Sequence, residues 1–207
     1  MQGLYLVTPN WDDTEKLLER TEQALTAGVA LLQYRHKDAT PALRREQGGA
    51  LRELCHKYSV PFLVNDHVAL CRELGADGVH LGGTDAPLAE VRASLGPNKL
   101  IGASCYGELA RAQAAQAAGA SYVAFGGFYP SKVKQYAVTT EPSILRHARE
   151  VISVPLCVIG GMTPENARPL VAEGAHLVAA ISSVYLADDV AAAVREFQSI
   201  ISPIAYP

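Results

Sequence analysis

Three side chains that can bind an anion alternate along one short segment of the sequence. Gln33, Arg35 and Lys37 are separated by the single residues Tyr34 and His36. In an extended strand, side chains two positions apart point the same way, so these three would present an amide, a guanidinium fork and an ammonium together. That set suits a phosphate or a diphosphate. The alternative is a solvated strand end that pairs with nearby acids.

Two carboxylates follow later apolar segments of the chain. Asp66 comes directly after Asn65, and Asp85 follows the next apolar segment. Because Mg²⁺ is commonly held by one or two carboxylates together with water and substrate phosphates, this pair beside a diphosphate predicts a magnesium site. Each aspartate also has a structural alternative as the N-cap of the following helix, and Pro87 supports that alternative for Asp85.

A second candidate anion site follows two apolar segments near the end of the chain. Gly160 and Gly161 come after one of them, and Ile181, Ser182 and Ser183 come after the other. Glycines let backbone N–H groups approach an oxyanion, and serines add hydroxyl donors. Two anion sites at one place imply two phosphorylated ligands, or one ligand that is phosphorylated at both ends.

The apolar segments that precede these polar groups predict the fold. Eight β-rich segments occur, at residues 3–8, 30–35, 62–65, 78–81, 100–104, 122–126, 156–160 and 177–181. Helical patterns are clearest at residues 12–26, 41–58, 108–118, 164–173 and 188–199. Alternating strands and helices form a parallel sheet, and eight units close into an α/β fold, the (β/α)8 TIM barrel. All strand C-termini then open onto one mouth, which would gather the polar groups. An open, doubly wound sheet is the alternative, although no GxGxxG motif follows the first segment.

Composition limits the class of protein. The 207 residues are 49% hydrophobic, which is enough for one sizeable core, so we expect a single domain over residues 1–207. A net charge of −3 and scattered basic residues argue against nucleic acid as a partner. No apolar run approaches the roughly twenty residues that span a bilayer, so we expect a cytoplasmic protein without membrane contact. The cysteines have neither CxxC nor metal-ligand spacing, which predicts small buried side chains and neither a disulfide nor zinc.

The ordered set of motifs resembles the thiamine phosphate synthase family over nearly the whole chain. The matching segments are Tyr5-Leu6-Val7-Thr8, Gln33-x-Arg35-x-Lys37, Asn65-Asp66, Gly78-Val79-His80-Leu81-Gly82 with Asp85, Tyr129-Pro130-Ser131 with Lys134, Ile159-Gly160-Gly161 and Ile181-Ser182. Each motif alone is only suggestive, whereas the set in this order is specific. The resemblance implies a transferase that condenses hydroxymethylpyrimidine diphosphate with a thiazole phosphate to give thiamine phosphate and pyrophosphate.

The resemblance also implies roles for individual residues. Those that would bind the pyrimidine diphosphate are Gln33, Arg35, Lys37, Asn65 and, on the pyrimidine side, Ser104. Those that would bind Mg²⁺, the expected cofactor, are Asp66 and Asp85. The cations that would act in catalysis by neutralising the departing pyrophosphate are Arg35, Lys37 and Lys134. Those that would bind the thiazole phosphate are Ser131, Gly161, Ile181 and Ser182.

The implied mechanism needs no nucleophilic side chain. Magnesium and cationic residues would assist departure of the diphosphate, and the thiazole nitrogen would capture the pyrimidine carbocation that is left. The protein would hold the two substrates in line and exclude water. We expect residues 132–140 to form a loop that closes over bound ligand.

Three positions depart from the family pattern. Gly83 stands where glutamine is expected, and His67 stands where arginine is common. Val133 replaces a hydroxyl residue, which removes one hydrogen bond to the thiazole phosphate that Lys132 partly replaces. These departures bear on affinity and leave the type of reaction unchanged.

Three other functions compete with the synthase. A related thiazole tautomerase relies on a histidine after the fifth strand, where this chain has Ser104-Cys105-Tyr106. A phosphosugar isomerase or aldolase needs a carboxylate base or a Schiff-base lysine, for which the sequence offers no clear candidate. A non-catalytic barrel that binds a phosphate ligand would be expected to have lost the aspartates or the cations. We interpret His80 and His36 as structural, and a homo-oligomer is compatible with the sequence.

Overall fold

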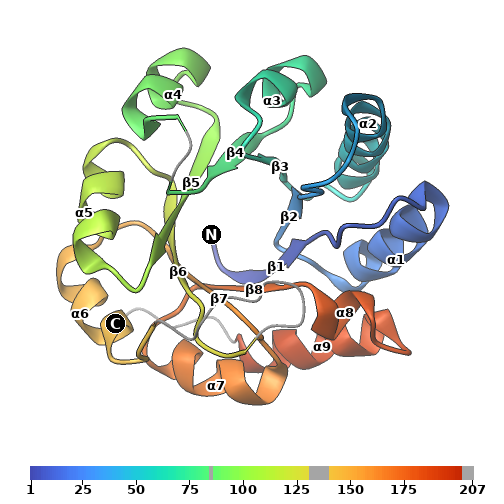
Figure 1. Cartoon of the computed structure of the whole chain (residues 1–207). Coiled ribbons are helices and arrows are strands. Elements are labelled where there is room, and N and C mark those ends of the chain that lie inside the picture. Colours follow the sequence, from blue (N-terminus) through green and yellow to red (C-terminus); the bar gives the residue numbers. More distant parts are fainter. Residues whose placement is uncertain (84–85, 131–139, 202–207) are drawn as a thin grey trace.

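Eight parallel strands form a closed barrel in the computed structural model, which describes residues 1–83, 86–130 and 140–201. The strands follow one another around the barrel in chain order (Figure 1). They are β1 Gly3–Val7, β2 Leu31–Tyr34, β3 Phe62–Asn65, β4 Gly78–Leu81, β5 Leu100–Tyr106, β6 Tyr122–Gly126, β7 Leu156–Ile159 and β8 Leu177–Ala180. The predicted (β/α)8 TIM barrel is confirmed.

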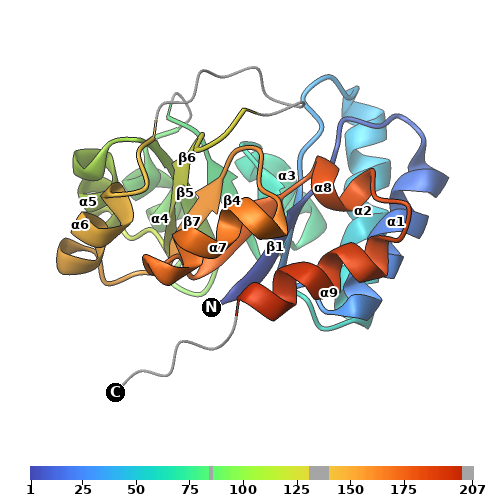
Figure 2. The same ribbon diagram turned by 90° about the horizontal axis from the view of Figure 1, so that it is seen from below.

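Helices surround the barrel as an outer ring (Figures 1 and 2). They are α1 Thr14–Ala27, α2 Pro41–Lys57, α3 Val68–Leu74, α4 Leu88–Leu95, α5 Leu109–Ala117, α6 Ile144–Val151, α7 Pro164–Ala172, α8 Ser182–Tyr185 and α9 Val190–Ile200. The five helices predicted from periodicity correspond to α1, α2, α5, α7 and α9 within two residues at each end. The short α8 departs from a simple alternation, because β8 is followed by two helices instead of one.

Side-chain caps explain where several helices begin. The Thr40 side chain accepts a hydrogen bond from the backbone N–H of Leu43 at the start of α2, and Pro41 occupies the first turn. Thr163 and Asn166 form a reciprocal capping box at the start of α7. The box fixes the point at which the chain leaves β7 and turns into α7, so it also fixes the loop between them.

Two layers of apolar side chains make the core. On β1, Leu4 and Leu6 pack outward into the layer between the strands and helices, whereas Tyr5 and Val7 point into the barrel. The inner layer also contains Leu31 and residues of β3, β6, β7 and β8. The same alternation on β2 continues from Leu31 to Gln33, and it places an amide inside the barrel near its C-terminal end.

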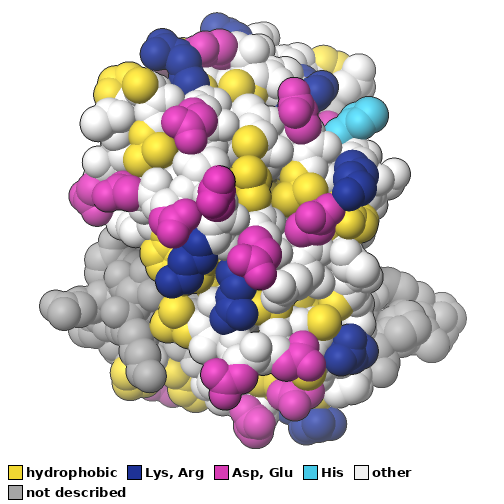
Figure 3. Space-filling model, turned by 90° about the vertical axis from the view of Figure 1, so that its right-hand side faces the viewer, with side chains coloured by type: hydrophobic (Ala, Val, Ile, Leu, Met, Phe, Trp, Pro, Cys, Tyr) yellow, Lys and Arg dark blue, Asp and Glu magenta, His cyan; other side chains and the backbone are white. Residues whose placement is uncertain are grey.

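The cysteines, the helices and the charged surface can be compared with what the composition predicts. All four cysteines are buried, as predicted. None of the helices in the described ranges is long and apolar enough to cross a membrane. Figure 3 shows Lys and Arg side chains interspersed with Asp and Glu on the face that carries α1 and α9. A single domain over residues 1–207 stays a prediction.

Candidate active site

A cavity of about 150 Å³ opens at the C-terminal ends of the strands. Six of the residues predicted to bind substrate or metal line it: Gln33, Arg35, Lys37, Asn65, Asp66 and Ser104. They come from β2, β3 and β5 or from the loops that follow β2 and β3. The structure therefore brings together side chains as far apart in the sequence as Gln33 and Ser104, as the barrel fold requires.

The threonine at the end of β1 positions the cationic segment. Strand β2 ends at Tyr34, so Arg35 and Lys37 lie just beyond it, although both still line the cavity. The Thr8 hydroxyl accepts a hydrogen bond from the Arg35 backbone N–H at 2.8 Å and donates one to the Arg35 carbonyl at 3.1 Å. Thr8 is fully buried, and its own N–H donates to the Gln33 carbonyl at 3.0 Å. Thr8 thus continues the strand pairing past the end of β2.

Asp66 is held by its backbone in an unusual conformation. Its φ is +60°, in the left-handed region that non-glycine residues seldom adopt. The Asp66 N–H donates to the His80 carbonyl at 2.9 Å, which joins the turn after β3 to β4. The N-cap of α3 is His67, which makes no side-chain capping bond. The alternative that Asp66 caps α3 is therefore wrong, and its carboxylate lines the cavity.

The carboxylate of Asp66 fits a hard cation such as Mg²⁺. Asp85, the other predicted ligand, lies outside the described residues. Within the described residues, no three or more His, Cys, Asp and Glu side chains cluster as a metal site. A cation here would depend on one or two carboxylates, on substrate and on water, which is the coordination that Mg²⁺ commonly accepts.

The loops after β7 and β8 lie next to each other. Strands β7 and β8 are paired, with Ile159 opposite Ala179, so Gly161 and Ile181 each follow a paired strand end by two residues. Gly161 has a φ of +60°, and a Cβ atom there would lie 2.3 Å from the Pro130 carbonyl oxygen. This glycine lets the loops after β6 and β7 approach closely. Of the residues predicted to bind the thiazole phosphate, Gly161, Ile181 and Ser182 follow the ends of paired strands and do not line the cavity. Ser131 lies outside the described residues, as does the predicted catalytic Lys134.

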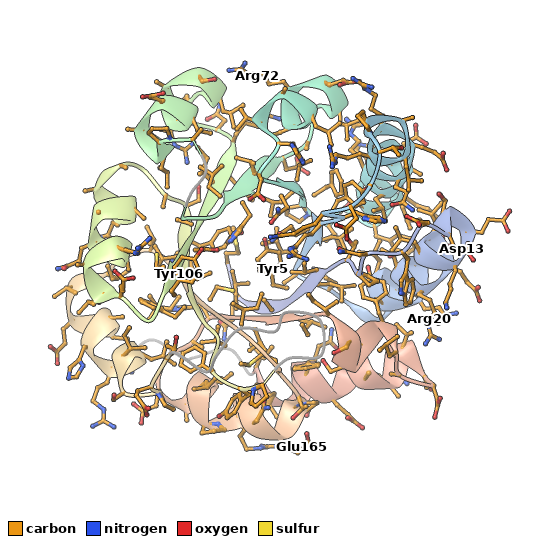
Figure 4. All side chains as sticks on the ribbon, viewed as in Figure 1. Tyr5, Asp13, Arg20, Arg72, Tyr106 and Glu165 are labelled. Carbon is orange, nitrogen blue, oxygen red and sulfur yellow. The ribbon has the colours of Figure 1, made fainter. Side chains whose placement is uncertain are left out.

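Three aromatic side chains for which the sequence predicted no binding or catalytic role lie in or below the cavity. Tyr5 and His80 line it, and Tyr122 lies fully buried beside them. Figure 4 shows Tyr5 inside the ring of strands, whereas the labelled Asp13 and Glu165 point outward. The sequence contained a signal for all three, because each belongs to a predicted strand and has the parity of the inward face. The interpretation of His80 as structural stays a prediction, although its side chain lines the cavity.

Burial decides the protonation of groups near the cavity. It raises the pKa values of the Tyr5 and Tyr122 phenols well above their ordinary range, so both stay neutral. It likewise raises the pKa of Cys157, which lines the cavity. Since a thiol and not a thiolate lies there, the site is not built for attack by cysteine.

Comparison with known proteins identifies the family. A profile of the thiamine monophosphate synthase family matches residues 4–184. A protein of Janthinobacterium sp. (strain Marseille), named thiamine-phosphate synthase, is 64% identical over 200 residues, which is 97% of this chain and 97% of that protein. This chain belongs to the thiamine monophosphate synthase family. It is therefore an enzyme, a transferase that forms thiamine phosphate.

Solved structures agree with membership of the thiamine monophosphate synthase family. Thiamine phosphate pyrophosphorylase from Pyrococcus furiosus superposes with a TM-score of 0.86 at 33% identity, covering 99% of this chain and 98% of that one. A 3-hexulose-6-phosphate synthase superposes with a TM-score of 0.71 at 21% identity, covering 98% of this chain and 100% of that one. The second likeness shows the fold alone. The 64% identity to a protein named thiamine-phosphate synthase favours the synthase over the tautomerase, phosphosugar and non-catalytic alternatives.

Two of the residues that depart from the thiamine monophosphate synthase pattern, Gly83 and His67, lie within the described part of the chain, so their neighbours can be named. A Cβ atom on Gly83 would lie 2.9 Å from Tyr106 and 2.9 Å from Arg111, so these two side chains fill the space that a longer residue at position 83 would use. His67 lines a neighbouring hollow of about 250 Å³, together with Lys37 and Arg44. The third departure, Val133, lies outside the described residues, as does most of the predicted loop 132–140.

Proposed function

We propose that the cavity binds hydroxymethylpyrimidine diphosphate with its ring between Gln33 and Ser104 and its diphosphate beside Arg35 and Lys37. The observation that carries this proposal is that all four side chains line one cavity. Gln33 lies within β2, whereas Arg35 and Lys37 follow the end of that strand. This order favours a ring placed deep in the barrel and a charged group at the mouth, where the ligand can keep part of its hydration.

The proposed cofactor is Mg²⁺, with Asp66 and Asp85 as its protein ligands. Asp66 lines the same cavity as Arg35 and Lys37, so a cation bound to its carboxylate would adjoin the diphosphate. When bound, Mg²⁺ supplies neutralising charge to the oxygens of a departing pyrophosphate. Asn65, the neighbour of Asp66, would contact the pyrimidine diphosphate through its amide.

The proposed reaction begins with cleavage of the bond between the pyrimidine methylene carbon and the diphosphate oxygen. The electron pair leaves with pyrophosphate, whose growing charge Arg35, Lys37 and Lys134 stabilise. The aminopyrimidine ring delocalises the positive charge that remains on the methylene carbon. The thiazole nitrogen then donates its lone pair to that carbon, which forms the new C–N bond. The walls of the barrel keep water from quenching the cation.

The proposed site for the thiazole phosphate consists of Gly161, Ile181, Ser182 and Ser131. The adjacency of the loops after β7 and β8 supports it, because backbone N–H groups and hydroxyls there can converge on one phosphate. In this arrangement the two substrates approach from opposite sides of one mouth. The proposal also includes a cytoplasmic location, small-molecule substrates as partners and a homo-oligomer.

A series of substituted pyrimidine diphosphates tests this proposal in the purified enzyme. An electron-withdrawing substituent on the ring should lower kcat steeply with little change in KM, because it destabilises the cation. Turnover should also stop when Mg²⁺ is removed with a chelator and resume when it is restored. A kcat that does not respond to the substituent would rule out the carbocation, and metal-independent turnover would rule out the cofactor.

A further inference from the structure

Tyr106 is an aromatic residue at the rim of the cavity. It is the last residue of β5, and it lies two residues beyond Ser104 in the direction of the mouth. It lines the cavity although it is 40% exposed, and none of the other exposed large hydrophobic residues in the described ranges does so. Figure 4 shows Tyr106 between α5 and the centre of the barrel. Tyr106 therefore stands over the end of the cavity where we place the pyrimidine ring.

The backbone holds Tyr106 in a conformation that is costly for a residue with a side chain. Its φ is +53°, and the Glu108 N–H donates to the Cys105 carbonyl at 3.0 Å, which closes a turn with Tyr106 as its second residue. Gly, Asn and Asp are the usual residues at a left-handed position in a turn. The pairing of β5 with β6 also shifts in register between Ser104 and Tyr106. Such irregularities redirect a side chain, and they are common beside active sites.

Contacts of the side chain restrict the ring of Tyr106 as well. The Gly83 N–H donates to the Tyr106 hydroxyl at 3.4 Å, a long hydrogen bond from the loop after β4. The guanidinium carbon of Arg111, on α5, lies 5.5 Å from the centroid of the Tyr106 ring. Arg111 is itself held, because its Nε donates to the Glu108 carboxylate at 2.9 Å. The ring is therefore joined to the loop after β4 and to α5, and it forms a fixed part of the cavity wall.

Glycine at position 83 makes room for this ring. A Cβ atom on Gly83 would lie 2.9 Å from Cε2 of Tyr106 and 3.4 Å from its hydroxyl oxygen. The φ of Gly83 lies outside the left-handed region, so the position needs the absence of a side chain and not a special backbone. The departure from glutamine at position 83 and the aromatic ring of Tyr106 therefore belong together in this chain.

We propose that the ring of Tyr106 excludes water from the carbocation on the β4–β5 side of the mouth, so that the thiazole nitrogen captures it. Capture by water would form a bond from the water oxygen to the methylene carbon and release a proton. The products would then be the pyrimidine alcohol and pyrophosphate. A fixed aromatic ring at the rim opposes this side reaction without bonding to either substrate. This inference rests on the proposed reaction.

Two substitutions of Tyr106 test this role in the intact enzyme. With Mg²⁺ and both substrates at saturation, the measured quantity is the ratio of pyrimidine alcohol to thiamine phosphate. Tyr106→Ala removes the ring, and we expect the ratio to rise about tenfold or more because water reaches the cation. Tyr106→Phe keeps the ring and loses only the long hydrogen bond from Gly83, so its ratio should stay close to that of the wild-type enzyme. Both products form at one site, so the ratio does not depend on how much of the enzyme is folded.

Gly83→Ala tests the same part of the wall from the neighbouring loop. The new methyl group would displace the Tyr106 ring, so we expect the ratio of alcohol to thiamine phosphate to rise in this variant too. Tyr58→Ala is the matched control. Tyr58 is a partly exposed tyrosine at the C-terminal end of α2, and it does not line the cavity. This variant should keep the wild-type ratio.

An unchanged ratio in Tyr106→Ala, or an equal rise in Tyr106→Phe or Tyr58→Ala, would overturn the role of the Tyr106 ring. Turnover in water labelled with heavy oxygen separates this failure from failure of the proposed reaction. Water that captures the cation leaves its label in the alcohol, whereas hydrolysis at phosphorus leaves the label in pyrophosphate. Alcohol without the label would contradict the carbocation. Labelled alcohol in equal proportion from the wild-type enzyme and Tyr106→Ala would contradict the exclusion of water by Tyr106 alone.

Discussion

The amide of Asn65 donates a hydrogen bond to the carboxylate of its neighbour Asp66, with 2.5 Å between Nδ2 and Oδ2. This bond orients the carboxylate, and the Asp66 side chain lines the cavity. The left-handed backbone of Asp66 and the hydrogen bond from its N–H to the His80 carbonyl further restrict the position of this side chain. This carboxylate is thus pre-organised before any metal arrives.

Replacing Asp66 with asparagine should therefore impair use of the metal. Asp66→Asn keeps the size of the side chain but removes its charge, so we expect kcat/KM to fall by about a hundredfold or more and the Mg²⁺ concentration for half-maximal rate to rise. A magnesium titration of the initial rate measures both. Asp188→Asn, which changes an exposed aspartate between α8 and α9, should leave both values unchanged. Equal effects from the two variants would remove Asp66 from the metal site.

Thr8→Val should weaken binding of the pyrimidine diphosphate, although it changes none of the side chains proposed to contact this substrate. Loss of the hydroxyl breaks both of its bonds to the Arg35 backbone, so we expect the KM for this substrate to rise several-fold and the unfolding free energy to fall by about 1–3 kcal/mol. Substrate-saturation kinetics and urea unfolding measure the two quantities. Thr21→Val is the control, because Thr21 is equally buried and also makes two hydrogen bonds, to Leu17 and Tyr185. It should lose stability with an unchanged KM.

Much of this arrangement could be predicted from the sequence, because the barrel follows from short-range patterns. Each apolar segment specified its strand within two residues, and the barrel rule then placed Arg35, Asn65 and Asp66 at one mouth. The sequence could not separate the two roles proposed for Asp66, since its positive φ depends on the contact with β4.

The hydrogen bonds that join Tyr5, Tyr122 and His80 could not be predicted in the same way. Tyr5 and Tyr122 are 117 positions apart, and their bond forms only when the barrel closes and brings β1 and β6 to face each other. The short α8 was also beyond prediction, since four residues give too little periodicity to recognise.

Gly161→Ala should weaken binding of the thiazole phosphate. The new methyl group would collide with the Pro130 carbonyl, so the loops after β6 and β7 must move apart, and we expect the KM for the thiazole phosphate to rise about tenfold or more. Gly96→Ala is the control for backbone strain alone. Gly96 also has a positive φ, of +80°, but no atom beyond its own chain neighbours lies within 4 Å of an added Cβ. If Gly96→Ala raises this KM as much as Gly161→Ala does, general destabilisation and not the loop contact is responsible.

Stability should fall in mildly acidic solution because of His176. Burial, followed by the positive N-terminus and Arg149, lowers the pKa of His176 below its ordinary 6.5. The unfolded chain then takes up the proton first, so the stabilisation is complete above about pH 6.5 and is lost as the pH falls through the lower folded pKa. We expect His176→Asn to shrink the difference between urea midpoints at pH 7.5 and pH 5.5. The same substitution at the exposed His147 should keep the wild-type difference.

A crystal structure of the enzyme with Mg²⁺ and the pyrimidine diphosphate would examine the proposed site most directly. We predict the ring between Gln33 and Ser104, the diphosphate against Arg35 and Lys37, and the cation on Asp66. A diphosphate bound elsewhere, or a cation that does not touch Asp66, would contradict the proposed site.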